Sequence, residues 1–421
     1  MTILHNKSLY QRLPFYYGWL IFSETFLLYV FMYGLRYSIG VFFVPIQEEL
    51  GWSSAITASV VTVFFCTYGI TGLFVGRLST KIGVRRSILI GGLLLGCGGL
   101  LASFTNQLWH FYVAWGMIAA SGSSILYTIP NMVLTRFFLK HRGKAVGWSS
   151  IGISVGQAIL VPFAASLIEA QSWRVAMATL SLFVIVGVSF SGYLIFRESP
   201  EAIGLEIDGS RPRQSQASKQ KRSDEKRSWT SHEARKTRDF KLILISYFFV
   251  VGGVISLLTF VVPHMRRIGV DPLLASTAFG IIGIMSALGS FIFGFISDKV
   301  GRKHTIIITA TGITISMFFS LVIPPDIFFL YLWVIIYGLT YGGIPEQYGA
   351  LIVDRFHTQH DISLFGYLMF TGALGGAFFP LIGGYLTDIT GQYFITLIFL
   401  GVGMVGALLT IIPIQEMRAL R

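Results

Sequence analysis

Long apolar segments, repeated along almost the whole chain, are the feature that most restricts its fold. Hydrophobic residues make up 53% of the 421 residues and charged residues only 12%, about half the charged share of an ordinary soluble protein. Within a bilayer every backbone amide must be satisfied internally, so only helices and closed barrels can span it. The apolar segments lack the period-two alternation of barrel strands. We therefore predict an all-α membrane protein embedded in a lipid bilayer.

Segments of roughly 20 apolar residues are long enough to cross a bilayer as helices. The sequence contains twelve of them, at about 17–44, 55–77, 87–105, 110–137, 144–168, 173–196, 240–264, 273–297, 304–323, 327–353, 362–387 and 392–413. Residues 197–239 are rich in Lys, Arg, Ser, Gln and Glu and have almost nothing to bury, which predicts a largely disordered linker. The predicted organisation is a six-helix bundle over 1–196, this linker, and a second six-helix bundle over 240–421.

A short polar loop between two apolar segments occurs twice. The second copy runs from Gly294 to Lys303, with Gly301 placed for a tight turn, and the first begins 218 residues earlier at Gly76. Three further pairs recur at a separation of 219 residues: Arg136 and Arg355, Gly147 and Gly366, Gly156 and Gly375. So long a period indicates a duplicated half-protein and not a solenoid repeat. Two pseudo-symmetric bundles of this kind are typical of transporters.

The distribution of positive charge predicts the orientation. Lysine and arginine total 32, and the formal net charge is +12. With both termini in the cytoplasm, 28 of these cations lie in cytoplasmic segments, as the positive-inside rule requires. We therefore expect a multi-pass protein of the plasma (inner) membrane with cytoplasmic termini and linker. The positive charge is spread over many loops, so we expect no nucleic-acid partner.

The repeated loop resembles the motif between helices 2 and 3 of the major facilitator superfamily. The matching residues are Gly76, Lys81, Gly83 and Arg85 in the first copy and Gly294, Asp298, Gly301 and Arg302 in the second. Other segments are similar to the monocarboxylate transporter and oxalate:formate antiporter group: Tyr17-Gly18-Trp19, Gly34 to Phe43, Gly51-Trp52-Ser53, Arg142 to Ala145, Trp173-Arg174, Pro200 to Leu205 and His264. The resemblance covers essentially the whole chain. It implies a carrier of small organic anions, coupled to protons or working by exchange. We also expect the protein to act as a monomer.

Two departures from that resemblance matter for function. The acid of the loop motif is replaced by Thr80 in the first copy, although Asp298 retains it in the second. The group commonly has an arginine in helix 8 that binds the substrate carboxylate, and Ser290 occupies that position here. A carboxylate would therefore have to be held by another residue.

Charged residues inside predicted spans are costly, at about 2.5 to 3.5 kcal/mol each on insertion scales, and three stand out. Arg36 in the first helix presents a planar fork that fits a carboxylate, and animal monocarboxylate carriers have a cation in this part of helix 1; the alternative is a structural ion pair with Glu346 or another acid. For Glu346 we weigh a proton carrier or gate against a hydrogen bond in helix packing. For Glu24 a structural interhelical bond is the alternative to a role in coupling.

Polar and aromatic side chains near the predicted mid-membrane level are candidates for lining a substrate cavity. Tyr33 shares a face of its helix with Arg36. The others are Tyr127, Asn131, Ser286, Ser290, Tyr337, Tyr341 and Phe370. The alternative for each is helix packing. The hypothesis is that Ser290 and Tyr341 orient an anion bound to Arg36.

Motifs of enzymes and cofactor sites are missing from the sequence, which has no phosphate loop, His/Cys cluster or nucleophile elbow. Cys66 and Cys97 have no metal or redox spacing. We therefore expect no enzyme activity, cofactor or metal. The prediction is a secondary active transporter of a small organic anion. The alternatives are a carrier of a neutral or cationic solute, such as an amino-acid derivative or a drug, and a transporter-like nutrient receptor.

Overall fold

The computed structural model describes residues 15–139, 142–209, 231–323, 326–356 and 362–414, with the backbone alone at 142–144, 209, 231–232, 345–346 and 362–363. Every regular element in these ranges is helical, which confirms the all-α prediction. Eleven of the described helices are long and apolar enough to span a membrane. The predicted ninth helix is also present, but its first three residues, Arg302, Lys303 and His304, make it less apolar.

The N-terminal half comprises the first six predicted spans. Its elements are α1 (Tyr17–Tyr37), α2 (Ile39–Leu50), α3 (Ser54–Ile82), α4 (Val84–Ser103), α5 (Leu108–Phe111), a π-helical segment (Tyr112–Ala119), α6 (Ala120–Phe137), α7 (Arg142–Ala170), α8 (Trp173–Val184), a second π-helical segment (Ile185–Phe190) and α9 (Ser191–Ile195). The first span is therefore α1 and α2 in series, and it extends six residues beyond the predicted end.

The C-terminal half comprises the other six spans. Its elements are α10 (Ser231–Lys236), α11 (Arg238–Arg267), α12 (Pro272–Val300), α13 (Arg302–Phe319), α14 (Ile327–Gly342), α15 (Pro345–Phe356), α16 (Ile362–Thr390) and α17 (Tyr393–Ile411). The tenth predicted span is divided at Gly343 and Ile344, between α14 and α15. This break places a non-helical turn within an otherwise apolar segment.

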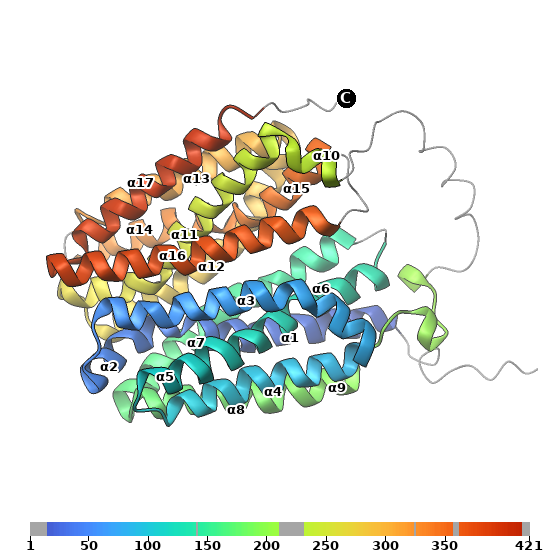
Figure 1. Cartoon of the computed structure of the whole chain (residues 1–421), viewed down its shortest axis with the longest axis horizontal. Coiled ribbons are helices and arrows are strands. Elements are labelled where there is room, and N and C mark those ends of the chain that lie inside the picture. The colour runs from blue at the N-terminus through green and yellow to red at the C-terminus, as the bar shows by residue number, and fades with distance from the viewer. Residues whose placement is uncertain (1–14, 140–141, 210–230, 324–325, 357–361, 415–421) are drawn as a thin grey trace, which may run out of the picture.

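The two halves lie on opposite sides of the molecule, blue to green below and yellow to red above in Figure 1. They meet where α3 packs on α16, α7 on α12, and α2 on α11. We call the right-hand end in Figure 1 the linker end, because α10 and the connection from α3 to α4 lie there, and the opposite end the far end. The far end carries the turn at Gly51, where α2 passes to α3.

The sequence repeat has a counterpart in packing. A Cβ added at Gly156 of α7 would lie 2.3 Å from the Val30 carbonyl oxygen of α1, and one at Gly375 of α16 would lie 2.1 Å from the Phe248 carbonyl oxygen of α11. These two contacts are separated along the chain by the repeat distance. Small residues allow helices to approach this closely, so the same glycine contact joins helices in each half.

The segment between the halves is partly folded. Its described ends form 3-10 turns at Glu201–Ile203 and Ile207–Gly209 and the helix α10. Asp208 accepts hydrogen bonds from the Leu139 amide at 3.1 and 3.2 Å, and Ala234 is fully buried. The prediction of a largely disordered linker is therefore wrong for these ends, because they find partners on neighbouring helices. Residues 210–230 lie outside the described ranges.

Candidate functional site

Arg36 lies in the last turn of α1, directly before the junction with α2. Its side chain is 8% exposed, and the carbon at the centre of its guanidinium group lies 4.8 to 5.4 Å from four ring centroids. These rings belong to Tyr33 of α1 and to Phe64, Phe65 and Tyr68 of α3. The cation is thus enclosed by an aromatic cage built from two helices.

The charge of Arg36 has no carboxylate partner in the described part of the chain. The ion pairs between described side chains are Arg174–Glu49, Arg266–Glu48, Arg302–Asp298, Arg302–Asp354 and Arg355–Asp239. Cation–π contacts contribute roughly 0.5 to 2 kcal/mol each, while burying an ion costs several kcal/mol. The rings therefore offset part of this cost.

A cavity of ≈ 30 Å³ lies against Arg36, with room for about two water molecules. It is lined by Arg36, Tyr37, Ile39, Val61, Phe64, Phe65 and Trp115 from the N-terminal half and by Ile255, Leu258 and Thr259 from α11. Arg36 therefore faces the junction of the two halves and not lipid. The cavity walls are mainly apolar apart from Arg36, Tyr37 and Thr259.

A series of tyrosines continues from the cage across the junction. The Tyr33 ring lies 5.2 Å from the Tyr37 ring and 6.5 Å from the Tyr127 ring. The hydroxyls of Tyr37 and Tyr341 are 3.0 Å apart, which joins α1 to α14. Tyr337 stacks on Tyr341 with ring centroids 5.9 Å apart. Four predicted site residues, Tyr33, Tyr127, Tyr337 and Tyr341, thus belong to one cluster around Arg36.

Tyr337 of this cluster and the neighbouring Asn131 each have a buried polar atom without a partner in the described residues. The Asn131 amide donates to the Tyr127 carbonyl oxygen at 3.1 Å, while its Oδ1 has no partner. The Tyr337 hydroxyl is likewise buried and unpaired. Such groups are costly unless something binds them. Both are therefore suited to receive a polar ligand.

Other predicted site residues serve helix contacts in this conformation. The hydroxyl of Ser286 lies 2.9 Å from that of Ser154 in α7, and the Ser290 hydroxyl donates to the Gly342 carbonyl oxygen at 2.5 Å. Phe370 of α16 lies against Gly69 of α3. Ser290 thus uses its hydrogen on the α14 backbone, at the position where the resembled group commonly has arginine.

One of the two predicted intramembrane acids, Glu24, lies apart from the cage. Glu24 is 5% exposed and accepts a hydrogen bond of 2.7 Å from Ser191 of α9. It precedes Arg36 by 12 residues, or about 18 Å along a helix. Glu346 is the second residue of α15, and its side chain lies outside the described structure.

The two copies of the loop motif use different contacts. Gly83 and Gly301 both have positive φ, 82° and 97°, a conformation that glycine adopts without strain. In the second copy Arg302 bonds Asp298 at 3.0 Å and Asp354 at 3.4 Å. In the first copy, where Thr80 replaces the acid, Arg85 donates to the Tyr193 carbonyl oxygen at 2.8 Å.

The remaining motif residues have few contacts. A Cβ added at Gly76 or Gly294 would meet no atom within 4 Å, and Lys81 is exposed. These positions lie on the exposed linker end of α3 and α12.

The sequence did not identify several residues of the site. The Arg36 guanidinium lies over the rings of Phe64, Phe65 and Tyr68, and the cavity beside it is also lined by Tyr37 and Thr259. The aromatic spacing of residues 64, 65 and 68 places them on one face of a helix and could have drawn attention to α3. Nothing in the sequence pairs that face with Arg36.

Two helical halves with a buried cation and a cavity at their junction are the arrangement expected of a membrane transporter. The family model described as Major Facilitator Superfamily matches residues 25–345 and 243–419. The chain belongs to this superfamily, as its loop motif indicated.

Individual relatives agree with that assignment. The chain is 25% identical to "Monocarboxylate transporter 12-B" of Danio rerio, over 96% of this chain and 88% of the relative. It is 24% identical to "Monocarboxylate transporter 13" of Bos taurus, over 94% and 89%. Among solved structures, the inward open xylose transporter XylE from E. coli has a TM-score of 0.73 at 16% identity, covering 96% of this chain and 98% of that one. The nucleoside transporter NupG has a TM-score of 0.70 at 14% identity, covering 94% and 100%.

Proposed function

We propose that this protein carries a small monocarboxylate across the membrane and that Arg36 binds the carboxylate. The observation that carries the proposal is a buried guanidinium at the junction of the halves with no described acid beside it. A guanidinium offers two parallel N–H donors to a carboxylate, and the apolar cavity wall suits a short hydrocarbon part. The relatives named as monocarboxylate transporters support the same substrate class.

Transport would proceed by alternating access to this site. We assign the linker end to the cytoplasm, because most of the described lysines and arginines lie at that end, and we expect a plasma-membrane monomer. The halves make contact at the far end, where Arg266 lies 3.8 Å from Glu48 and the Ser54 amide donates to Asp388. These contacts close the far end.

Coupling to protons belongs to the same proposal. Glu346 lies next to the break between α14 and α15, where a change in helix geometry can alter its exposure to water. The pKa of a carboxyl group rises when the group is buried and falls when it is exposed to water. A group that alternates between these two environments can therefore take up and release a proton. Exchange of two anions at Arg36 would need no such group.

Counterflow in proteoliposomes tests the substrate class. Vesicles loaded with an unlabelled short monocarboxylate should accumulate the labelled form transiently, and external monocarboxylates should compete better than dicarboxylates, neutral analogues or amines. Competition by neutral or cationic solutes alone would replace the proposal with the other carrier class. Binding without counterflow would indicate a receptor.

A further inference from the structure

The first turn of α3 is capped by a carboxylate from the other half of the molecule. Asp388 lies in the last turn of α16, and its two carboxylate oxygens accept hydrogen bonds of 2.8 Å from the Ser54 and Ala55 amides. The first amides of a helix have no partner within it, and a negative charge there is favourable. One side chain therefore satisfies two such amides across the junction.

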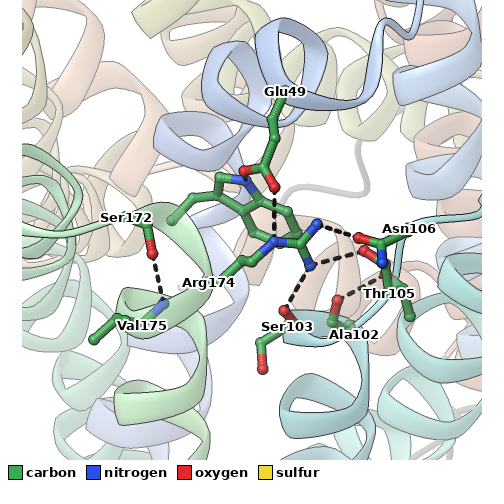
Figure 2. Close-up of polar contacts among 9 residues, drawn as sticks. Glu49, Ala102, Ser103, Thr105, Asn106, Ser172, Arg174 and Val175 are labelled. Atoms are coloured by element: carbon green, nitrogen blue, oxygen red, sulfur yellow. Dashed lines mark hydrogen bonds and ion pairs between the residues drawn. The ribbon is translucent and has the colours of Figure 1, made fainter.

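The receiving end of α3 is fixed to the N-terminal half. Figure 2 shows Arg174 at the centre of a network that joins the end of α2, the start of α8 and the α4–α5 connection. Arg174 donates to Glu49 and to the Ser103 and Thr105 carbonyl oxygens, each at 2.8 Å. Gln47 of α2 then donates to the Ser54 hydroxyl at 3.2 Å. A bond from Asp388 to this end of α3 thus connects one half with the other.

The pseudo-symmetric position does not repeat the arrangement. The corresponding helix in the C-terminal half, α12, is capped by Asp271 directly before it, which accepts from the Leu273 and Leu274 amides at 3.0 Å. The residue 219 positions before Asp388 is Glu169, which is exposed at the end of α7. The cap between halves is therefore one-sided, and Asp271 is a cap of the same chemistry within one half.

The cap depends on close contact between α3 and α16. A Cβ added at Gly384 would lie 2.7 Å from the Ser54 carbonyl oxygen and 2.9 Å from the Ala58 Cβ. Further along, Thr62 donates to the Ala377 carbonyl oxygen at 2.7 Å. Separating the helices at the far end would break the Asp388 bonds first and expose Ala58.

We propose that Asp388 is a latch that holds the far end of the transporter closed. Its two hydrogen bonds exist when α3 and α16 are in contact and are lost when the far end opens. The latch therefore sets the fraction of time for which the central site is open to the far end. The proposal requires the two halves to move relative to each other, as in the proposed function, but it does not depend on which solute binds Arg36.

A cysteine beneath the latch can measure far-end opening. Ala58→Cys is made in a Cys66→Ser, Cys97→Ser background, because Ala58 is fully buried, and the protein is held in nanodiscs with a water-soluble maleimide. The labelling rate is proportional to the open fraction. Asp388→Ala should raise this rate roughly twofold to thirtyfold, the change in an equilibrium constant that loss of a helix cap produces. Asp388→Asn, which keeps one acceptor oxygen, should raise it less.

Two controls separate the latch from general loosening. Asp271→Ala removes a cap within one half and should leave the labelling rate of Ala58→Cys unchanged. Ala310→Cys, fully buried within α13, reports unfolding and should stay unlabelled in every variant. An unchanged rate in Asp388→Ala, an equal increase in Asp271→Ala, or labelling of Ala310→Cys together with Ala58→Cys would overturn the proposal.

Discussion

The hydroxyls of Tyr37 and Tyr341 lie 3.0 Å apart and join α1 of one half to α14 of the other. Tyr37 directly follows Arg36 in the chain, and both residues line the same cavity. Movement of the halves must therefore change the surroundings of the cation. Binding at Arg36 and rearrangement of the junction are linked by position.

The first prediction concerns this tyrosine pair. Tyr37→Phe and Tyr341→Phe should each lower stability by about 1 kcal/mol, and the double variant should cost less than the sum, since both remove the same bond. The measurement is a double-mutant cycle on thermal or detergent-induced unfolding. Tyr385→Phe, at an exposed position of α16, serves as the control. Strict additivity would show that the two hydroxyls do not interact.

A second prediction distinguishes a packing role from a substrate-binding role for Ser290, which occupies the position where the resembled group commonly has arginine. Ser290→Ala should lower stability by about 1 kcal/mol, because its hydroxyl bonds the Gly342 backbone, and should leave the KM for uptake unchanged. KM is measured in proteoliposomes. A severalfold rise in KM with unaltered stability would return Ser290 to the substrate site.

A third prediction uses the repeated glycines. Gly156→Ala and Gly375→Ala place a methyl group within 2.3 and 2.1 Å of a carbonyl oxygen, so each should lower stability by roughly 1 to 3 kcal/mol. Gly147→Ala and Gly366→Ala, where no atom lies within 4 Å, should be neutral or stabilising. Thermal unfolding in detergent distinguishes the pairs. Equal effects at all four positions would contradict the packing described.

The fourth prediction concerns proton coupling. Glu346→Gln should abolish the response of uptake to a pH gradient while counterflow continues, because exchange does not require a net proton movement. Glu24→Gln should retain that response, since an amide oxygen can still accept the hydrogen bond from Ser191. The measurement is tracer uptake at inward and outward pH gradients. A preserved response in Glu346→Gln would assign this residue to packing.

Much of the fold could be predicted because the bilayer imposes it. The length of the apolar segments predicted the twelve membrane-spanning segments. Pairs of identical residues 219 positions apart, such as Gly156 and Gly375, indicated two related halves. The junction of α1 and α2 at Ser38 and the π-helical segments had no sequence signal, because they depend on local packing between helices. The ordered linker ends were missed because burial of Ala234 depends on neighbours distant in the chain.

The candidate site was partly visible in the sequence. Arg36 stood out because a charge inside a span is costly. Its aromatic cage could not be predicted, since Phe64, Phe65 and Tyr68 come from another helix. Ser286 and Ser290 share one face of α12, as predicted, but their hydroxyls bond neighbouring helices and do not line the cavity. The sequence could not show this, because it depends on how α12 packs against those helices.

The most direct measurement is uptake of a labelled short monocarboxylate by proteoliposomes containing Arg36→Ala or Arg36→Lys. Loss of one partner of a buried charge pair costs roughly 2 to 5 kcal/mol, so Arg36→Ala should lose uptake at substrate concentrations that saturate the wild type. Arg36→Lys should retain a fraction, because lysine keeps the charge without the planar fork. Both proteins should remain folded by size-exclusion chromatography. Wild-type uptake by folded Arg36→Ala would contradict the role of Arg36 as the carboxylate-binding residue.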